Sequence, residues 1–174
     1  MAKLRGKVAV ITGANSGIGL AAARLFAHEG AQVFMAGRRQ GELDMAAKAI
    51  GARARAVHGD VSNLADLDRL FAVVRDEAGA IDVLFANAGG GSFLPLGSIT
   101  EEHFESIFAT NVKGTLFTVR KALPLLKDGG SIILTGSTAA TTGTPAFSVY
   151  SASKAAIRNF ARAGSSIWRR DGYG

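Results

Sequence analysis

The sequence predicts an α/β fold built on a doubly wound parallel sheet with strand order 3-2-1-4-5. Short apolar segments alternate with helical patterns along the chain, and a glycine-rich turn follows the first of them. These segments are hydrophobic at nearly every position, which is typical of parallel strands covered on both faces. The strands are expected at residues 7–12, 32–36, 53–58, 81–86 and 131–135.

Helices are expected between the strands, and several capping residues mark their ends. Gly30 is placed to end the first helix. Ser62 is expected to cap the helix before the fourth strand. Thr100 is expected to cap a longer helix whose apolar pattern extends to Leu123. No internal repeat or linker interrupts this alternation, so residues 1–174 are expected to form one domain.

The composition excludes several classes of protein. Its 48% hydrophobic and 20% charged residues are typical of globular rather than disordered or membrane proteins. No apolar run approaches the roughly 20 residues of a membrane span, and no signal sequence precedes the first strand, so a cytoplasmic location is expected. The chain has no cysteine and only scattered histidines, so neither disulfides nor a metal site are expected. The net charge of +6 comes from dispersed basic residues without interleaved aromatics, which favours a solvated surface over nucleic-acid binding.

The turn after the first strand has the spacing Gly13-x-x-x-Gly17-x-Gly19. Glycines there permit positive φ and let backbone N–H groups approach a pyrophosphate at the positive end of a helix. The spacing differs from Gly-x-Gly-x-x-Gly, and a tight turn without a ligand is the alternative. Its place between the first strand and first helix favours a dinucleotide in a Rossmann-type sheet. The expected contacts at this turn are Gly13, Asn15, Ser16, Gly17, Ile18 and Gly19.

Arg38 and Arg39 follow the second strand. Dinucleotide folds that use NAD place a carboxylate there to bind the ribose hydroxyls. Two guanidiniums instead match the geometry of a 2′-phosphate, which favours NADP over NAD. A solvated arginine pair in a loop is the alternative. After the third strand, Asp60 and Val61 are expected to receive the adenine, although Asp60 also suits a turn or cap.

Tyr150 and Lys154 are separated by four residues, which places both side chains on one helix face. An ammonium close to a phenol favours the phenolate and so makes the phenol a better acid–base catalyst. Such pairs also occur by chance on exposed helices. Ser137 follows the carboxyl end of the fifth strand, where ligands bind in such sheets. Its hydroxyl is expected to hold a substrate carbonyl, although it is one of several loop serines.

Together these features resemble the short-chain dehydrogenase/reductase family over residues 4 to about 163. The matching positions are Thr12-Gly13-x-x-x-Gly17-x-Gly19, Asp60, Asn87-Ala88-Gly89, Asn111, Ser137, Tyr150 and Lys154. A small departure is Ala86, where the family often has asparagine. The resemblance implies a nicotinamide cofactor, a small-molecule carbonyl or alcohol substrate and, for a full-length chain, a homo-oligomer.

The resemblance also implies a role for each matching side chain. Tyr150 would be the general acid–base, and Lys154 would favour its ionisation and bind the ribose. Ser137 would orient the carbonyl, and Asn87-Ala88-Gly89 would close the floor of the cofactor site. Asn111 would hold a relay water by interrupting its own helix. From the residues alone, a core asparagine bonded to backbone is the preferred interpretation of Asn111.

The chain departs from the family at its end, because relatives continue through a sixth and seventh strand with a substrate-covering segment between them. Residues 164–174 are expected to be an aberrant tail, since Gly164 costs about 1 kcal/mol relative to alanine in a helix and no helical periodicity follows. The fifth strand would be an unpaired edge, and the lid over the substrate would be missing. A fragment boundary and a reading-frame shift near Gly164 both explain this tail. A shifted frame can encode Asp-Leu-Ala-Ala-Arg-Arg-Val, much like the family's usual continuation, which favours the frame shift.

The sequence therefore predicts an NADP-preferring oxidoreductase that transfers a hydride between a nicotinamide cofactor and a carbonyl or alcohol. The alternative is an inactive NADP-binding remnant, since the substrate segment is missing. Loops near residues 93–95 and 144–147 suggest a moderately apolar carbonyl compound. Neither a nucleic acid nor a membrane is expected as a partner.

Overall fold

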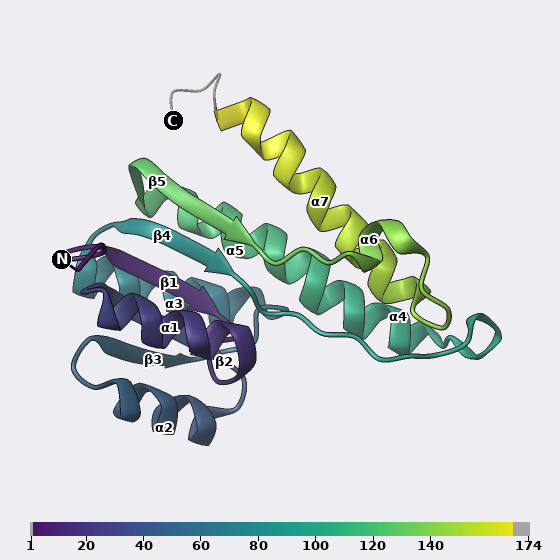
Figure 1. The fold of residues 1–174 in the computed structure, drawn as a ribbon, viewed down its shortest axis with the longest axis horizontal. Coiled ribbons are helices and arrows are strands. Elements are labelled where there is room, and N and C mark those ends of the chain that lie inside the picture. Colours follow the sequence, from purple (N-terminus) through teal and green to yellow (C-terminus); the bar gives the residue numbers. More distant parts are fainter. Residues whose placement is uncertain (1, 169–174) are drawn as a thin grey trace.

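A computed structural model describes the backbone of residues 2–168 and the side chains of residues 2–164. Five parallel strands form one sheet in the order β3-β2-β1-β4-β5, which confirms the predicted sheet and strand order (Figure 1). The strands are β1 (Val8–Thr12), β2 (Gln32–Gly37), β3 (Ala54–His58), β4 (Ile81–Ala86) and β5 (Leu126–Leu134).

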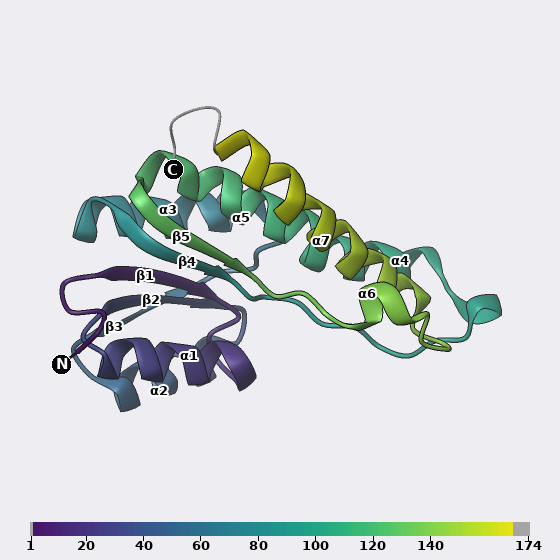
Figure 2. The ribbon, with the colours of Figure 1, turned by 45° about the horizontal axis from the view of Figure 1, so that its top comes forward.

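Helices cover both faces of this sheet (Figure 2). Apolar residues of α1 and α2 pack on one face, and those of α3 and α5 pack on the other. The helices are α1 (Gly17–His28), α2 (Gln40–Ile50), α3 (Leu64–Ala78), α4 (Glu101–Phe108), α5 (Thr115–Ala122), α6 (Ala139–Thr142) and α7 (Ser148–Trp168). A π-helical segment, Ala109–Gly114, joins α4 to α5, and short 3₁₀ turns lie at Leu96–Ser98 and Leu123–Leu125.

The central strand β1 shows why its own residues are almost all apolar. All five of its residues are buried. Val8 and Val10 pack into the core beneath α3, whereas Ala9 and Ile11 pack into the core beneath α1 and α2. Full burial of a side chain such as Ile11 contributes about 1.5–3 kcal/mol, so both faces of the strand stabilise the sheet.

The edge strand β5 differs from its prediction in length and burial. It begins at Leu126 rather than Ser131, and its pairing with β4 contains a register shift between Ile81 and Val83. The shift accommodates residues 127–130, a polar segment with two glycines that carries no strand pattern in the sequence. Among the described strands, β5 pairs only with β4, and Ile133 is 40% exposed.

The capping residues were predicted with mixed success. Gly30 follows α1 at φ 99°, and the Thr100 hydroxyl accepts a hydrogen bond from the His103 N–H, so both predictions are confirmed. The prediction that Ser62 caps α3 is wrong. Asn63 caps that helix by accepting from the Ala65 N–H, because Ser62 already donates its hydroxyl to Asp60.

Helix α7 continues through Gly164 to Trp168, although no helical periodicity was expected from Gly164 onward. A cost of about 1 kcal/mol for one glycine does not end a helix that spans 21 residues. Residues 169–174 of the expected tail lie outside the described residues. Within residues 2–168, no helix has the length and hydrophobicity needed to cross a membrane.

The buried carboxylate of Asp82 connects the amino ends of β1, β4 and β5 by hydrogen bonds. Asp82 is 7% exposed and accepts hydrogen bonds from the Val8 backbone N–H and from the ammonium groups of Lys7 and Lys127. Burial by itself raises the pKa of Asp82, but the three donors outweigh burial and hold the pKa below its usual value. The folded state therefore favours the charged carboxylate.

We predict that Asp82→Asn lowers the free energy of unfolding at neutral pH by about 2 kcal/mol, since charged hydrogen bonds are lost. Because the folded pKa is depressed, this stabilisation exists above the unfolded pKa and disappears as the pH falls through the folded one. Urea denaturation should therefore show the variant and the parent converging in acid.

The matched control is Asp76→Asn, since Asp76 is 67% exposed and pairs only with its neighbour Arg75 among the described ion pairs. It should change stability by less than about 0.5 kcal/mol. Equal losses in the two variants would show that Asp82 does not fasten the strands.

Candidate active site

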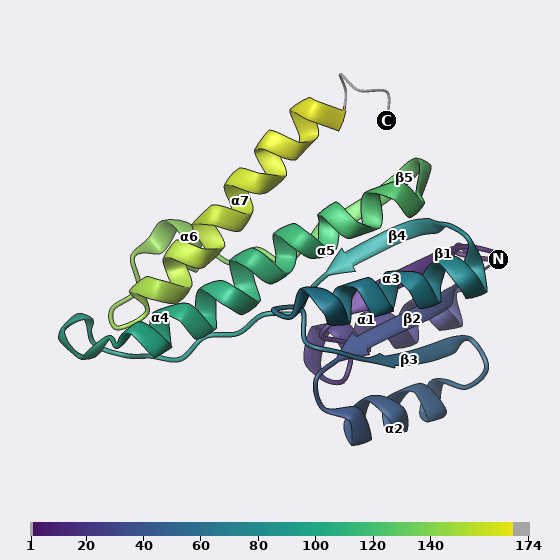
Figure 3. The ribbon, with the colours of Figure 1, turned by 180° about the vertical axis from the view of Figure 1, so that it is seen from behind.

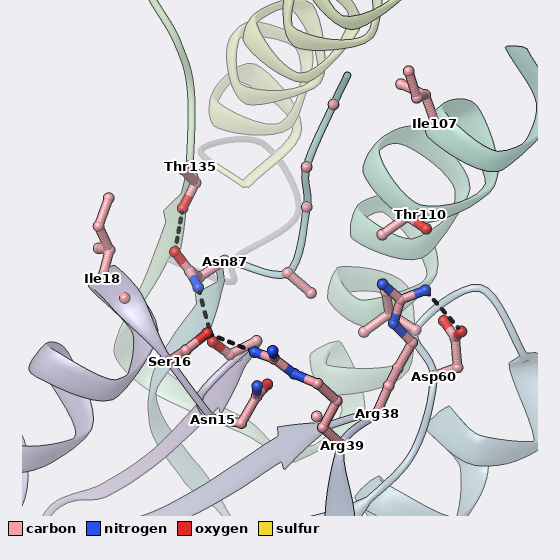
Figure 4. Close-up of a pocket in the computed structure, with 18 of the residues that line it drawn as sticks. Asn15, Ser16, Ile18, Arg38, Arg39, Asp60, Asn87, Ile107, Thr110 and Thr135 are labelled. Atoms are coloured by element: carbon pink, nitrogen blue, oxygen red, sulfur yellow. Dashed lines mark hydrogen bonds and ion pairs between the residues drawn. The ribbon is translucent and has the colours of Figure 1, made fainter. Parts of the chain in front are cut away.

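A cavity of about 820 Å³ lies at the carboxyl ends of the strands (Figure 4). Its walls come from the turn before α1, the segments after β2, β3 and β4, and the first turns of α7. Most of the predicted site residues line it together: Gly13, Asn15, Ser16, Gly17, Ile18, Arg38, Arg39, Asp60, Val61, Asn87, Ala88, Gly89, Tyr150 and Lys154. Gly19, Asn111 and Ser137 do not line this cavity.

The three glycines of the first turn meet two different requirements. Gly13 and Gly17 have φ of 66° and 55°, a conformation that residues with a Cβ rarely adopt. At Gly19 a Cβ would collide with the Gly13 carbonyl and the Asn87 side chain. Gly19 therefore lets the first turn of α1 approach the ends of β1 and β4, while the cavity wall is formed by its neighbours.

At one end of the cavity, each arginine lies beside an acidic side chain. The Arg39 guanidinium is 3.0 Å from the Glu42 carboxylate and donates to the Ser16 hydroxyl. Arg38 lies 3.6 Å from the Asp60 carboxylate (Figure 4). Both arginines are more than half exposed, so these ion pairs are weak and open to exchange.

Asp60 has a structural role in addition to lining the cavity. Its Oδ1 accepts hydrogen bonds from the backbone N–H and the hydroxyl of Ser62. This confirms the sequence-based interpretation of Asp60 as a turn residue. The adjacent Val61 is 6% exposed and packs tightly on Gly114. A Cβ added to Gly114 would lie 2.6 Å from Cγ2 of Val61.

Asn87 ties together the ends of three strands (Figure 4). Its Nδ2 donates to the Thr12 carbonyl at 3.1 Å, and its backbone N–H donates to the Thr12 hydroxyl. Its Oδ1 accepts from the Thr135 hydroxyl at 3.1 Å. Thr135 was not predicted as a site residue, and its position directly after β5 was the available signal.

Asn111 lies in the π-helical segment and is fully buried. Its Nδ2 donates to the Gly90 carbonyl and to the Ser153 hydroxyl, both at 2.9 Å, while its Oδ1 accepts from the Gly90 N–H. The helix is thus interrupted at Asn111, and the side chain binds backbone as a core asparagine would. Such π-helical interruptions occur frequently at functional sites.

Ser153 is a site-adjacent residue that sequence reasoning missed. Its hydroxyl is buried, donates to the Tyr150 carbonyl at 2.7 Å and accepts from Asn111. A serine in a helix can donate its hydroxyl to the carbonyl three residues earlier. The three-residue step from Tyr150 to Ser153 was the only signal in the sequence for this bond.

Tyr150 and Lys154 lie at the other end of the cavity from the arginines. The Lys154 ammonium donates to the Thr135 carbonyl at 2.8 Å and lies 5.7 Å from the centre of the Tyr150 ring. Lys154 is only 4% exposed, and this burial lowers the pKa of its ammonium. Tyr150 and Lys154, which lie four residues apart in the sequence, therefore both line the cavity.

Ser137 faces a second hollow of about 440 Å³ between the end of β5 and α7. Its hydroxyl accepts a hydrogen bond from the Ala139 N–H at 3.2 Å. Lys154 lines both hollows, whereas Tyr150 lines only the first. The carbonyl-orienting role of Ser137 stays a prediction.

The chain belongs to the short chain dehydrogenase family, whose model matches residues 7–172. It is 56% identical over 172 residues to Oxidoreductase asL5 of Sarocladium schorii, covering 98% of this chain and 69% of that protein. It is 41% identical over 158 residues to Galactitol 2-dehydrogenase of Agrobacterium fabrum, covering 89% of this chain and 62% of that protein.

A solved structure, a short-chain dehydrogenase/reductase described as glucose/ribitol dehydrogenase from Brucella melitensis, matches with a TM-score of 0.92 and 30% identity. The match covers 95% of this chain and 71% of that one. The chain thus spans roughly two thirds of the length of these relatives. Its family is one of oxidoreductases that use a nicotinamide cofactor, NAD or NADP.

We predict that stability rises with alkaline pH because of Lys154. Its pKa is lower in the folded state, so the unfolded chain binds more protons between the folded and unfolded pKa values, and the free energy of unfolding increases across that interval. Lys154→Met should remove this increase in urea denaturation measured from neutral to alkaline pH. The control Lys48→Met, at an exposed position on α2, should retain it; an unchanged rise in Lys154→Met would contradict the assignment.

Proposed function

We propose that this chain binds NADP(H) in the large cavity and transfers a hydride between that cofactor and a carbonyl or alcohol. One observation carries the proposal. A single cavity joins the glycine turn and two arginines at one end to Tyr150 and Lys154 at the other. Groups suited to binding phosphate and groups suited to acid–base chemistry thus share one cavity of about 820 Å³.

The residues present suit a dinucleotide. The backbone of the glycine turn at the start of α1 would bind the pyrophosphate, since the helix N-terminus favours negative charge. Asp60 and Val61 would lie against the adenine, and Arg38 and Arg39 would receive the 2′-phosphate that distinguishes NADP from NAD. Lys154 would bind the nicotinamide ribose.

The chain's own chemistry would be proton transfer. In the reducing direction, the cofactor when bound would supply the hydride that forms the new C–H bond at the carbonyl carbon. The Tyr150 O–H bond would break to give its proton to the carbonyl oxygen, where the former π electron pair forms the new O–H bond. The Lys154 ammonium favours the phenolate left behind, and alcohol oxidation reverses each transfer. Ser137 would orient the carbonyl.

A second candidate is a chain that binds NADP without turnover. The observation that favours it is that Ser137 lines the second hollow and Tyr150 the first, with Lys154 lining both. NADPH oxidation with a panel of moderately apolar carbonyl compounds separates the two candidates. Binding with turnover supports the first, and binding without turnover supports the second.

We predict that NADP(H) binds more tightly than NAD(H), and that replacing both Arg38 and Arg39 with alanine removes the difference. Loss of charged phosphate contacts should weaken NADP(H) binding by about 10- to 100-fold while leaving NAD(H) binding nearly unchanged. Isothermal titration calorimetry measures both affinities.

The matched control is Arg55→Ala, which removes a comparable exposed ion pair with Glu77 outside the cavity. This variant should bind both cofactors as the parent does. Equal affinities of the unmutated chain for the two cofactors would refute the preference for NADP.

We predict that Tyr150→Phe lowers the rate of hydride transfer by about 100-fold or more, since a general acid contributes that much. Cofactor affinity should stay within about twofold, because the lost group is a proton donor and not an anchor. Stopped-flow NADPH oxidation and cofactor titration provide the two measurements. Undiminished turnover in this variant would remove Tyr150 from the mechanism.

A further inference from the structure

We infer that Gly91 and Phe147 are positioning residues that fix the ring of Tyr150, an inference that rests on the proposed function of that tyrosine. Gly91 belongs to the segment after β4, and Phe147 to the segment before α7. Neither residue is part of the family pattern recognised in the sequence. Both contact the aromatic ring rather than its hydroxyl.

The first contact is a stack of rings. The Phe147 and Tyr150 ring centres are 4.2 Å apart with 21° between the planes. Phe93 stacks on Phe147, also at 4.2 Å, with 12° between the planes. Three rings therefore form a continuous column from the cavity wall to Phe93, which is 67% exposed. Offset stacking favours parallel planes, so a tilt of Tyr150 disturbs its neighbour.

The second contact is a backbone placed directly against the ring. A Cβ on Gly91 would lie 2.5 Å from Cδ2 of Tyr150, 2.8 Å from Cγ and 2.9 Å from Cβ. No residue with a side chain fits there unless the ring moves. The requirement is local, because a Cβ on Gly97 of the same loop region would meet nothing within 4 Å.

The two segments are also fastened to each other. The Leu94 N–H donates to the Ala146 carbonyl at 2.7 Å, so the segment after β4 lies beside the segment before α7 (Figure 3). Ala146 has φ 56° and is the non-glycine residue with positive φ among those described. Such a conformation persists only when its surroundings impose it, and here it immediately precedes the stacked Phe147.

These contacts matter because the proton donor sits at the far end of the Tyr150 ring from the backbone. Rotation about the side-chain bonds swings the hydroxyl across the cavity. Contacts from Gly91 and Phe147 restrict that rotation, so they hold the hydroxyl where a carbonyl oxygen would receive its proton. A displacement of about 1 Å can cost about 100-fold in rate.

The experiment measures the environment of the Tyr150 ring directly by fluorine NMR. The chain has two tyrosines, so Tyr173→Phe leaves Tyr150 as the single site for incorporated fluorotyrosine. In this background the fluorine NMR spectrum should show one resonance displaced from that of free fluorotyrosine by the stacked ring. Gly91→Ala and Phe147→Leu should each move the resonance toward the free position or split it.

Two control variants distinguish a specific effect on the Tyr150 ring from a general loss of packing. Gly97→Ala adds the same methyl group to an open position, and Phe104→Leu breaks the Phe104–Phe108 stack outside the cavity. Both should leave the resonance in place. The conservative Phe147→Tyr variant keeps a stacking ring, but adds a tyrosine, so it is used only in the kinetic measurements.

In kinetics, Gly91→Ala and Phe147→Leu should lower kcat by about 100-fold while the KM for the cofactor stays within about twofold. Phe147→Tyr should restore kcat, whereas the two control variants should not lower it. An unmoved resonance and unchanged kcat in Phe147→Leu would overturn the inference, even if Gly91→Ala fails to fold. If the parent chain has no turnover, the proposed function fails. The fluorine spectra alone then decide whether Gly91 and Phe147 fix the Tyr150 ring.

Discussion

The side-chain amide of Asn87 lies where the carboxyl ends of β1, β4 and β5 converge, and the shape of the cavity depends on its three partners. It donates to the Thr12 carbonyl, accepts from the Thr135 hydroxyl and contacts the position where Gly19 has no Cβ. The parallel sheet brings these strand ends together, but only a short, two-sided hydrogen-bonding group can join them without filling the space above. The glycine turn, the floor of the cavity and the segment that receives Lys154 are all placed by this junction.

The end of the cavity that holds Tyr150 and Lys154 is connected to that junction through buried polar groups. Lys154 binds the carbonyl of Thr135, whose hydroxyl binds Asn87, and Asn111 links Gly90 to Ser153. Burial disfavours the Lys154 ammonium and lowers its pKa, so this arrangement costs stability. Retention of a buried cation at such a cost is typical of residues kept for function rather than for folding.

Sequence reasoning succeeded where a local pattern determines the structure. The bounds of β4 were predicted without error because both its faces are buried and turns flank it. The start of β5 was missed, since residues 127–130 are polar and follow the sheet only through a register shift. The tight turn before α1 was predicted from its glycines, whereas the place of Ser137 and the contacts of Gly91 depend on how distant segments meet. Ring stacking across residues 93, 147 and 150 leaves no periodic signal.

The positive charge at the arginine end of the cavity is paired with carboxylates and does not form an isolated cluster of cations. Arg38 and Arg39 each lie beside a carboxylate, Asp60 and Glu42, at the open end of the cavity. Exposed pairs of this kind contribute at most about 1 kcal/mol, so a phosphate with its greater charge can displace the carboxylates. Until then, the pairs keep both guanidiniums near the cavity rather than extended into solvent. This orientation lowers the entropic cost of ordering two long side chains when the proposed cofactor binds, and the same carboxylates would oppose any anion too small to contact both arginines.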